Sequence, residues 1–128
     1  MEPMYQLTGR VIRGQGNGHT VGMPTANLEC PPGTALPPYG VYAAEATVDG
    51  ETWPGVTNVG CRPTLTADER PTVETLLLGF SGDLYGKEMQ LRLYRYLRPT
   101  RRMGSLLEVE KQVEADAREA RRILAQMR

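Results

Sequence analysis

Alternating apolar and polar positions are the clearest pattern in the first hundred residues. On residues 40–48, every second position from Tyr42 to Val48 is apolar, as a half-buried strand requires. Asp49-Gly50 follows, and these residue types favour the positive φ angles of a tight hairpin. Similar short runs, divided by many of the 14 glycines and 10 prolines, predict an antiparallel body. The expected strands are residues 5–13, 25–28, 40–48, 51–59, 72–80 and 88–97.

The last expected strand, residues 88–97, alternates regularly, and Pro99 ends it because proline donates no backbone hydrogen bond. Strict alternation predicts which side chains face inward and which face outward. The inward set is Met89, Leu91, Leu93 and Leu97, and the outward set is Gln90, Arg92, Tyr94 and Tyr96.

The end of the chain, residues 105–127, follows a helical pattern instead. It has no Gly or Pro, and Ser105 with Glu108 forms a capping-box motif. We therefore expect six antiparallel strands that close on themselves at about 5–98, and a helix at about 105–127 packed on one side. The apolar stripe of that helix is Leu106, Val109, Val113, Ala117, Ala120 and Leu124.

Length and charge narrow the class of protein. The 128 residues fit one domain, and 15 basic residues balance 15 acidic ones. This balance disfavours binding to nucleic acid or anionic lipid. No apolar run is long enough to span a bilayer, and the sequence does not begin with a signal-peptide pattern, so we expect a cytoplasmic protein. Cys30, Cys61 and the single histidine, His19, make a poor zinc set and no hydrolase triad, so we interpret the cysteines as ordinary thiols.

A glycine-rich segment, Gly-Gln-Gly-Asn-Gly-His-Thr at 14–20, follows the first expected strand. Successive backbone N–H groups in such a loop can face phosphate oxygens. The segment lacks the Lys-Ser/Thr of a Walker loop, and no helix obviously follows it, as a dinucleotide fingerprint would require. The pattern alone favours a plain turn over a phosphate cradle.

Three polar residues could carry chemistry. Thr25 and Asn27 point the same way if their segment is extended, and their oxygens suit Mg²⁺ if phosphates supply the missing charge. By spacing alone, ordinary turn hydrogen bonds are the favoured explanation of these two residues. Glu74 stands just before a run of three leucines, where it either faces solvent or acts as a general base on a substrate hydroxyl.

The order of six motifs identifies a resemblance to the riboflavin kinase (flavokinase) family, a module also found at the C-terminus of bacterial bifunctional FAD synthetases. The resemblance covers about residues 9–120. The motifs are Gly-x-Gly-x-Gly (14–18) with Gly-Met-Pro-Thr-Ala-Asn-Leu (22–28), Gly-Val-Tyr-Ala (40–43), Gly-Val-x-Asn-x-Gly-x-Arg-Pro-Thr (55–64), Val-Glu (73–74), Asp-Leu-Tyr-Gly (83–86) and Leu-Arg-Pro (97–99).

This resemblance implies a mainly β fold, a six-stranded antiparallel split β-barrel of Greek-key type with a C-terminal helix. It also implies transfer of phosphate from Mg²⁺–ATP to riboflavin, giving FMN. By the same resemblance, Glu74 is the base, Thr25 and Asn27 hold the magnesium and the nucleotide, and two further sets of residues bind the substrates. The ATP set is Arg13, Gly16, Gly18, His19 and Thr20, and the flavin set is Arg98, Met103 and Ser105.

The sequence departs from the family pattern in two places, which leaves the catalytic rate open. Asn17 and His19 stand where the family usually has Arg or Lys, and Thr75 and Gly79 stand where it often has larger or acidic residues. An alternative is therefore a regulatory protein that binds flavin or nucleotide with weak or no kinase activity. Either way the expected partners are small molecules. A monomer is compatible with the sequence, and so is either a stand-alone kinase or a module of a bifunctional enzyme.

Overall fold

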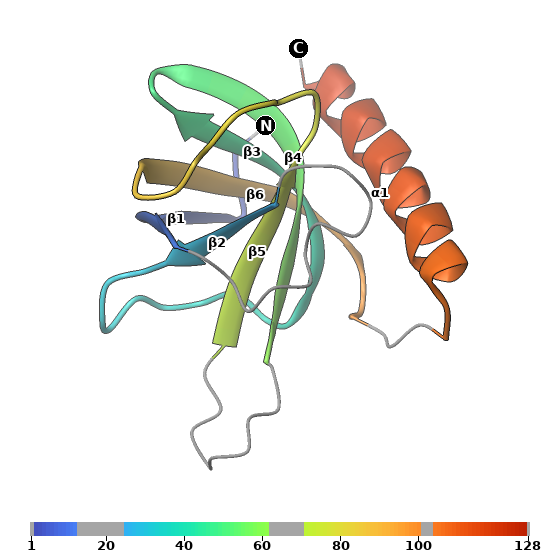
Figure 1. Cartoon of the computed structure of the whole chain (residues 1–128), viewed down its shortest axis with the longest axis horizontal. Helices are drawn as coiled ribbons and strands as arrows, with labels where there is room; N and C mark the ends of the chain where they lie inside the picture. Colours follow the sequence, from blue (N-terminus) through green and yellow to red (C-terminus); the bar gives the residue numbers. More distant parts are fainter. Residues whose placement is uncertain (1, 13–24, 62–70, 101–103, 128) are drawn as a thin grey trace.

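The computed structural model of the chain describes residues 2–12, 25–61, 71–100 and 104–127 (Figure 1). Within these ranges, six strands form a closed barrel in the order β1-β2-β5-β4-β3-β6, and every neighbouring pair is antiparallel. The predicted antiparallel barrel with one C-terminal helix is therefore confirmed. The elements are β1 (Tyr5–Ile12), β2 (Thr25–Glu29), β3 (Gly40–Val48), β4 (Glu51–Cys61), β5 (Pro71–Leu77), β6 (Glu88–Arg98) and α1 (Leu106–Gln126).

Strand β3 is buried on both of its faces. Its even-numbered residues from Tyr42 to Val48 point into the barrel, as the alternation predicts. On the other face, Val41 and Ala43 pack with Ile123 of helix α1. Figure 1 shows α1, in orange and red, lying along one side of the barrel, where it packs on β3 and β4. The helix thus covers the part of the outer surface that β3 and β4 form.

The predicted start of the helix is correct. The Ser105 hydroxyl accepts a hydrogen bond from the Glu108 N–H at 3.2 Å, as an N-cap does. The Glu108 carboxylate accepts from the N–H of Gly104 at 3.1 Å, one residue earlier than in a standard capping box. Leu106, which the stripe includes, is 56% exposed. Within the described residues, no helix is long and apolar enough to cross a membrane.

Turn geometry explains the boundaries of the strands. Asp49 and Gly50 both have positive φ, at 51° and 78°, which confirms the predicted β3–β4 hairpin. Strand β5 ends at Leu77, three residues before its predicted end, and Gly79 follows with φ of 82°. That left-handed conformation favours glycine, which accounts for the residue found at 79.

Two irregularities in β6 change the predicted facing of its last residues. Between Leu93 and Arg98, the register to β3 shifts twice, so that Tyr96 rather than Leu97 pairs with the inward-facing Tyr42. The rings of Tyr96 and Tyr42 meet edge to face, with centroids 5.4 Å apart. Leu97 instead packs with Val41, Ala43 and Ile123, between the barrel and helix α1. The predictions of an inward Leu97 and an outward Tyr96 are therefore wrong, because each shift adds one residue to β6.

Candidate active site

A row of polar residues crosses the outer face of the barrel. Glu74 on β5 is directly opposite Asn27 on β2 and also opposite Asn58 on β4. Asn58 is in turn opposite Val41 on β3, which pairs with Arg98 on β6. These five residues form one continuous row across five neighbouring strands, called the polar row below, and four of them are polar, while Val41 is apolar and buried under helix α1.

The facing of the polar row follows from its neighbours along the strands. Ala26 and Leu28 belong to the core inside the barrel, so Thr25 and Asn27 point outward, on one common face as predicted. Val73 and Leu77 are also in that core, which places Glu74 outward as well. Residues directly opposite on neighbouring strands have Cβ atoms about 5 Å apart. The fold therefore brings Asn27 and Glu74, 47 positions apart in sequence, next to each other.

Charge is unevenly distributed along the polar row. Glu74 is half-buried and has a neutral carboxamide on either side, Asn27 and Asn58. The positive group, Arg98, is three strands away around the closed barrel, with Asn58 and the buried Val41 between them in the row. The guanidinium is thus not a direct neighbour of the carboxylate.

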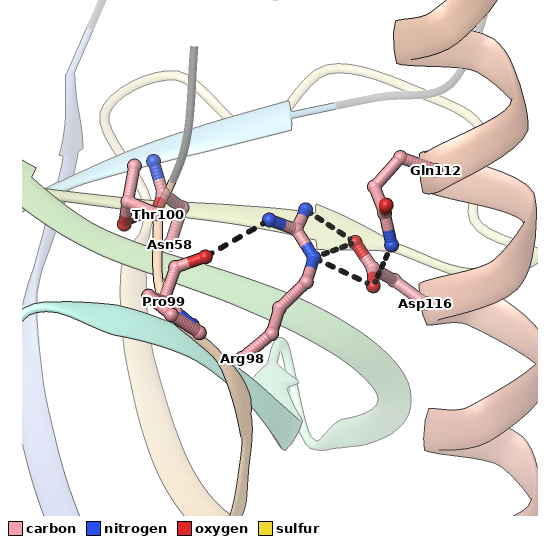
Figure 2. Close-up of polar contacts among 6 residues, drawn as sticks. All are labelled: Asn58, Arg98, Pro99, Thr100, Gln112 and Asp116. Atoms are coloured by element: carbon pink, nitrogen blue, oxygen red, sulfur yellow. Dashed lines mark hydrogen bonds and ion pairs between the residues drawn. The ribbon is translucent and has the colours of Figure 1, made fainter. Parts of the chain in front are cut away.

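Arg98 itself is bound to the helix (Figure 2). Its Nε donates to Oδ1 of Asp116 at 3.0 Å and its Nη2 donates to Oδ2 at 2.8 Å. Gln112, one turn earlier on α1, donates to the same carboxylate at 3.0 Å. The Nη1 of Arg98 donates to the carbonyl oxygen of Pro99 at 3.1 Å. The guanidinium therefore connects the end of β6 to the middle of the helix.

A second contact connects the same stretch of chain to the polar row. The Thr100 hydroxyl donates to Oδ1 of Asn58 at 2.8 Å. Asn58 is thereby fixed on one side by Thr100 and flanked on the other by Glu74.

The departure from the family pattern at Thr75 does not alter this face, because Thr75 is buried inside the barrel and hydrogen-bonds Thr57 at 2.8 Å.

The donor atoms beside Glu74 fit one kind of metal binding. Thr25 and Asn27 offer neutral oxygens on one face, one strand from a carboxylate. Magnesium prefers oxygen ligands and keeps waters or substrate phosphates in its shell. This set suits a magnesium ion that arrives with phosphates, since the two neutral oxygens alone supply no charge to hold it. Among the described residues, no group of three or more His, Cys, Asp or Glu side chains is arranged to hold a metal ion.

Cys30 shows no sign of chemical activation. It is a free cysteine that packs against the barrel core, and burial raises the pKa of its thiol. The thiol is therefore protonated at neutral pH and behaves as a small apolar side chain. The side chain of Cys61 lies outside the described residues.

The structure places only part of the predicted site. Thr25, Asn27 and Glu74 come together, Ser105 caps the helix, and Arg98 lies at the far end of the polar row. Six predicted residues lie outside the described residues, so their roles stay predictions. They are Arg13, Gly16, Gly18, His19, Thr20 and Met103.

Two residues of the site were missed by the sequence predictions. Asn58 belongs to a quoted motif, but its place beside Glu74 depends on the register between β4 and β5. Asp116 had a local signal, because it is a charged residue three positions after Val113 and four before Ala120, inside the apolar stripe of the helix.

The fold and the polar row define a small β-barrel whose interior is filled by side chains and whose candidate site lies on the outer face. A family model described as Flavokinase, riboflavin kinase, matches residues 1–124. The chain belongs to the riboflavin kinase (flavokinase) family.

Curated relatives support this assignment. A bifunctional riboflavin kinase/FMN adenylyltransferase from Bacillus subtilis is 36% identical over 126 residues, which is 97% of this chain and 40% of the relative. A protein of the same name from Escherichia coli K12 is 40% identical over 118 residues, or 91% of this chain and 37% of the relative. The chain therefore spans about two fifths of the length of these relatives.

Solved structures show the same fold. A Streptococcus pneumoniae chain described as a macrolide-efflux protein aligns with a TM-score of 0.84 and 27% identity, over 93% of this chain and 38% of that one. Riboflavin kinase from Trypanosoma brucei aligns with a TM-score of 0.63 and 21% identity, over 98% and 82% of the two chains. At that identity the second likeness supports the architecture alone.

Proposed function

We propose that this chain transfers the terminal phosphate of ATP to the terminal ribityl hydroxyl of riboflavin, which yields FMN and ADP. Membership of the flavokinase family supports the reaction class. The observation that carries the proposal is the strand register that sets Glu74 between Asn27 and Asn58, with Thr25 on the same face. A base and a nucleotide-binding pair are thereby adjacent, as phosphoryl transfer to a hydroxyl requires.

In the proposed mechanism, Glu74 accepts the proton of the ribityl hydroxyl, and the oxygen of that hydroxyl attacks the γ-phosphorus of ATP. The bond from the γ-phosphorus to the bridging oxygen breaks, and ADP leaves with that oxygen. Thr25 and Asn27 would hold the magnesium ion of the nucleotide, and that ion would supply positive charge to the phosphates. Most of the rate then comes from positioning the hydroxyl in line with the phosphate, because the transition state needs little covalent help.

The flavin belongs, in this proposal, on the Arg98 side of the polar row. Riboflavin is elongated, with a planar ring at one end and the reactive hydroxyl at the other. The contact of Thr100 with Asn58 brings the segment after Arg98 next to the neighbour of Glu74, so one elongated ligand can reach both. The expected flavin contacts are Arg98, Met103 and Ser105, and the expected ATP loop is residues 13–20.

A turnover assay tests the proposed function. The purified chain, mixed with riboflavin, ATP and Mg²⁺, is expected to form FMN and ADP in a 1:1 ratio, measured by chromatography with fluorescence detection of FMN and ultraviolet absorbance detection of ADP. Omission of magnesium is expected to stop the reaction. A folded sample that forms no FMN contradicts the proposal.

The departures at Asn17 and His19 favour one second candidate, a regulator that binds flavin or nucleotide without turnover. Both residues replace cations of the usual glycine loop with groups that are mostly neutral at pH 7. The same assay separates the two candidates. Tight binding of riboflavin or FMN, measured by flavin fluorescence, with no FMN formed from ATP would support the regulator.

A further inference from the structure

Asp116 is a carboxylate in a place where the helix otherwise buries apolar side chains. It is 6% exposed and lies on α1 between Val113 and Ala120, whose side chains both pack against the barrel. A buried charge is costly unless charged and hydrogen-bonding partners surround it. Asp116 has such partners in Arg98 and Gln112. The position is thus built around one specific contact with the end of β6.

The contact between Arg98 and Asp116 fastens residues 98–100 to the helix, and a second contact fastens them to the polar row. Arg98 begins the segment and binds Asp116 with two nitrogens, and its third nitrogen closes onto Pro99. Thr100 ends the segment and binds Asn58, the neighbour of Glu74 in the row. Residues 98–100 are therefore fastened both to the helix and to the row that contains the proposed base (Figure 2).

We infer that Asp116 is a positioning residue for the flavin side of the site and acts through Arg98. This inference rests on the proposed function. Asp116 fixes the direction of the guanidinium and with it the path of residues 98–100 beside Asn58. Without its charge, the segment loses its contact with the helix and keeps the pairing of Arg98 with Val41 and the Thr100 contact, so the guanidinium loses its fixed direction while the nucleotide side, on β2 and β5, keeps its geometry.

The test is the replacement Asp116→Asn, which keeps the shape of the side chain and removes the charge that holds Arg98. We expect the KM for riboflavin to rise about tenfold, because small displacements of positioning groups weaken substrate alignment. The KM for ATP and kcat are expected to stay within about twofold to threefold of the wild type. Riboflavin affinity, measured separately by quenching of flavin fluorescence, is expected to fall by the same factor as KM rises.

Glu119→Gln is the matched control. It removes an ion pair on the same helix, Glu119 with Arg122, whose side chains are 45% and 56% exposed. Neither KM is expected to change in this variant. An equal rise of the riboflavin KM in both variants would show a general effect of helix charge and overturn the inference.

A purely structural role for Asp116 predicts a different result. The thermal midpoint of Asp116→Asn would then fall while the riboflavin KM of the folded fraction stays unchanged, and this outcome overturns the inference. If Asp116→Asn does not fold, Asp116→Glu keeps the charge and is expected to raise only the riboflavin KM, by about threefold. An unchanged riboflavin KM in that variant is the contradicting result.

The experiment also separates this inference from the proposed function. A wild-type chain that binds riboflavin without forming FMN contradicts the kinase, and the riboflavin affinity of Asp116→Asn then still decides the role of Asp116. A wild-type chain that forms FMN, with unchanged riboflavin affinity in Asp116→Asn, contradicts the positioning role alone. A wild-type chain that binds no riboflavin contradicts both.

Discussion

Replacement of Glu74 by glutamine is expected to lower kcat for FMN formation by about a hundredfold to ten-thousandfold, the range that a general base contributes. This loss corresponds to about 3–5 kcal/mol of transition-state stabilisation. Glutamine has nearly the same shape and still fits between Asn27 and Asn58, but it cannot accept the proton of the ribityl hydroxyl. Riboflavin affinity is therefore expected to stay within about threefold of the wild type, because the change acts on the transition state.

Glu51→Gln is the matched control for Glu74→Gln. It makes the same chemical change at an exposed position at the other end of the β3–β4 hairpin, seven residues before Asn58 on the same strand. Its kcat is expected to equal that of the wild type. A Glu74→Gln enzyme with more than about a tenth of the wild-type kcat would contradict the role of Glu74 as the base.

Replacement of Asn27 by alanine is expected to weaken the nucleotide side of the site instead. The substitution removes one of the two proposed magnesium–nucleotide contacts, so kcat/KM for Mg²⁺–ATP is expected to fall by on the order of tenfold to a hundredfold. The magnesium concentration for half-maximal rate is expected to rise. Stability is expected to change little, since Asn27 lies on the outer face and its inward neighbours, Ala26 and Leu28, are unchanged.

Glu29→Gln provides the comparison for Asn27→Ala. Glu29 is on the same strand and the same face, two residues further on, and is exposed. This variant is expected to keep the magnesium dependence of the wild type. If Asn27→Ala raised the KM for riboflavin and left that for Mg²⁺–ATP unchanged, the assignment of β2 to the nucleotide would be wrong.

Local patterns predict most of the fold, because the alternation of apolar and polar residues is visible within the sequence of each strand. The hairpin at Asp49 and Gly50 is predicted from two residues, since their conformation is intrinsic to the turn. The register shifts in β6 escape prediction, because an added residue changes the facing of Tyr96 and Leu97 without leaving a mark in composition. Because of these shifts, Arg95 pairs with the outward-facing Ala43, which keeps its charged side chain out of the barrel core.

The candidate site is predictable only in its local parts. Alternation alone places Thr25 and Asn27 on one face, and the structure agrees. The meeting of Asn27 with Glu74 depends on the pairing of β2 with β5, which are not consecutive strands, and a one-residue slip would turn either side chain inward. The pair formed by Arg98 and Asp116 depends on the docking of the helix, so the charged residue in the helix stripe hints at a partner without identifying it.

A crystal structure of the chain with riboflavin, Mg²⁺ and a non-hydrolysable ATP analogue tests the central claim most directly. The terminal ribityl hydroxyl is expected to lie about 2.6–3.2 Å from a carboxylate oxygen of Glu74, the distance required of a general base. The phosphates and magnesium are expected beside Thr25 and Asn27, and the flavin ring is expected toward Arg98. A flavin bound on another face of the barrel, with Glu74 touching neither ligand, would contradict the account.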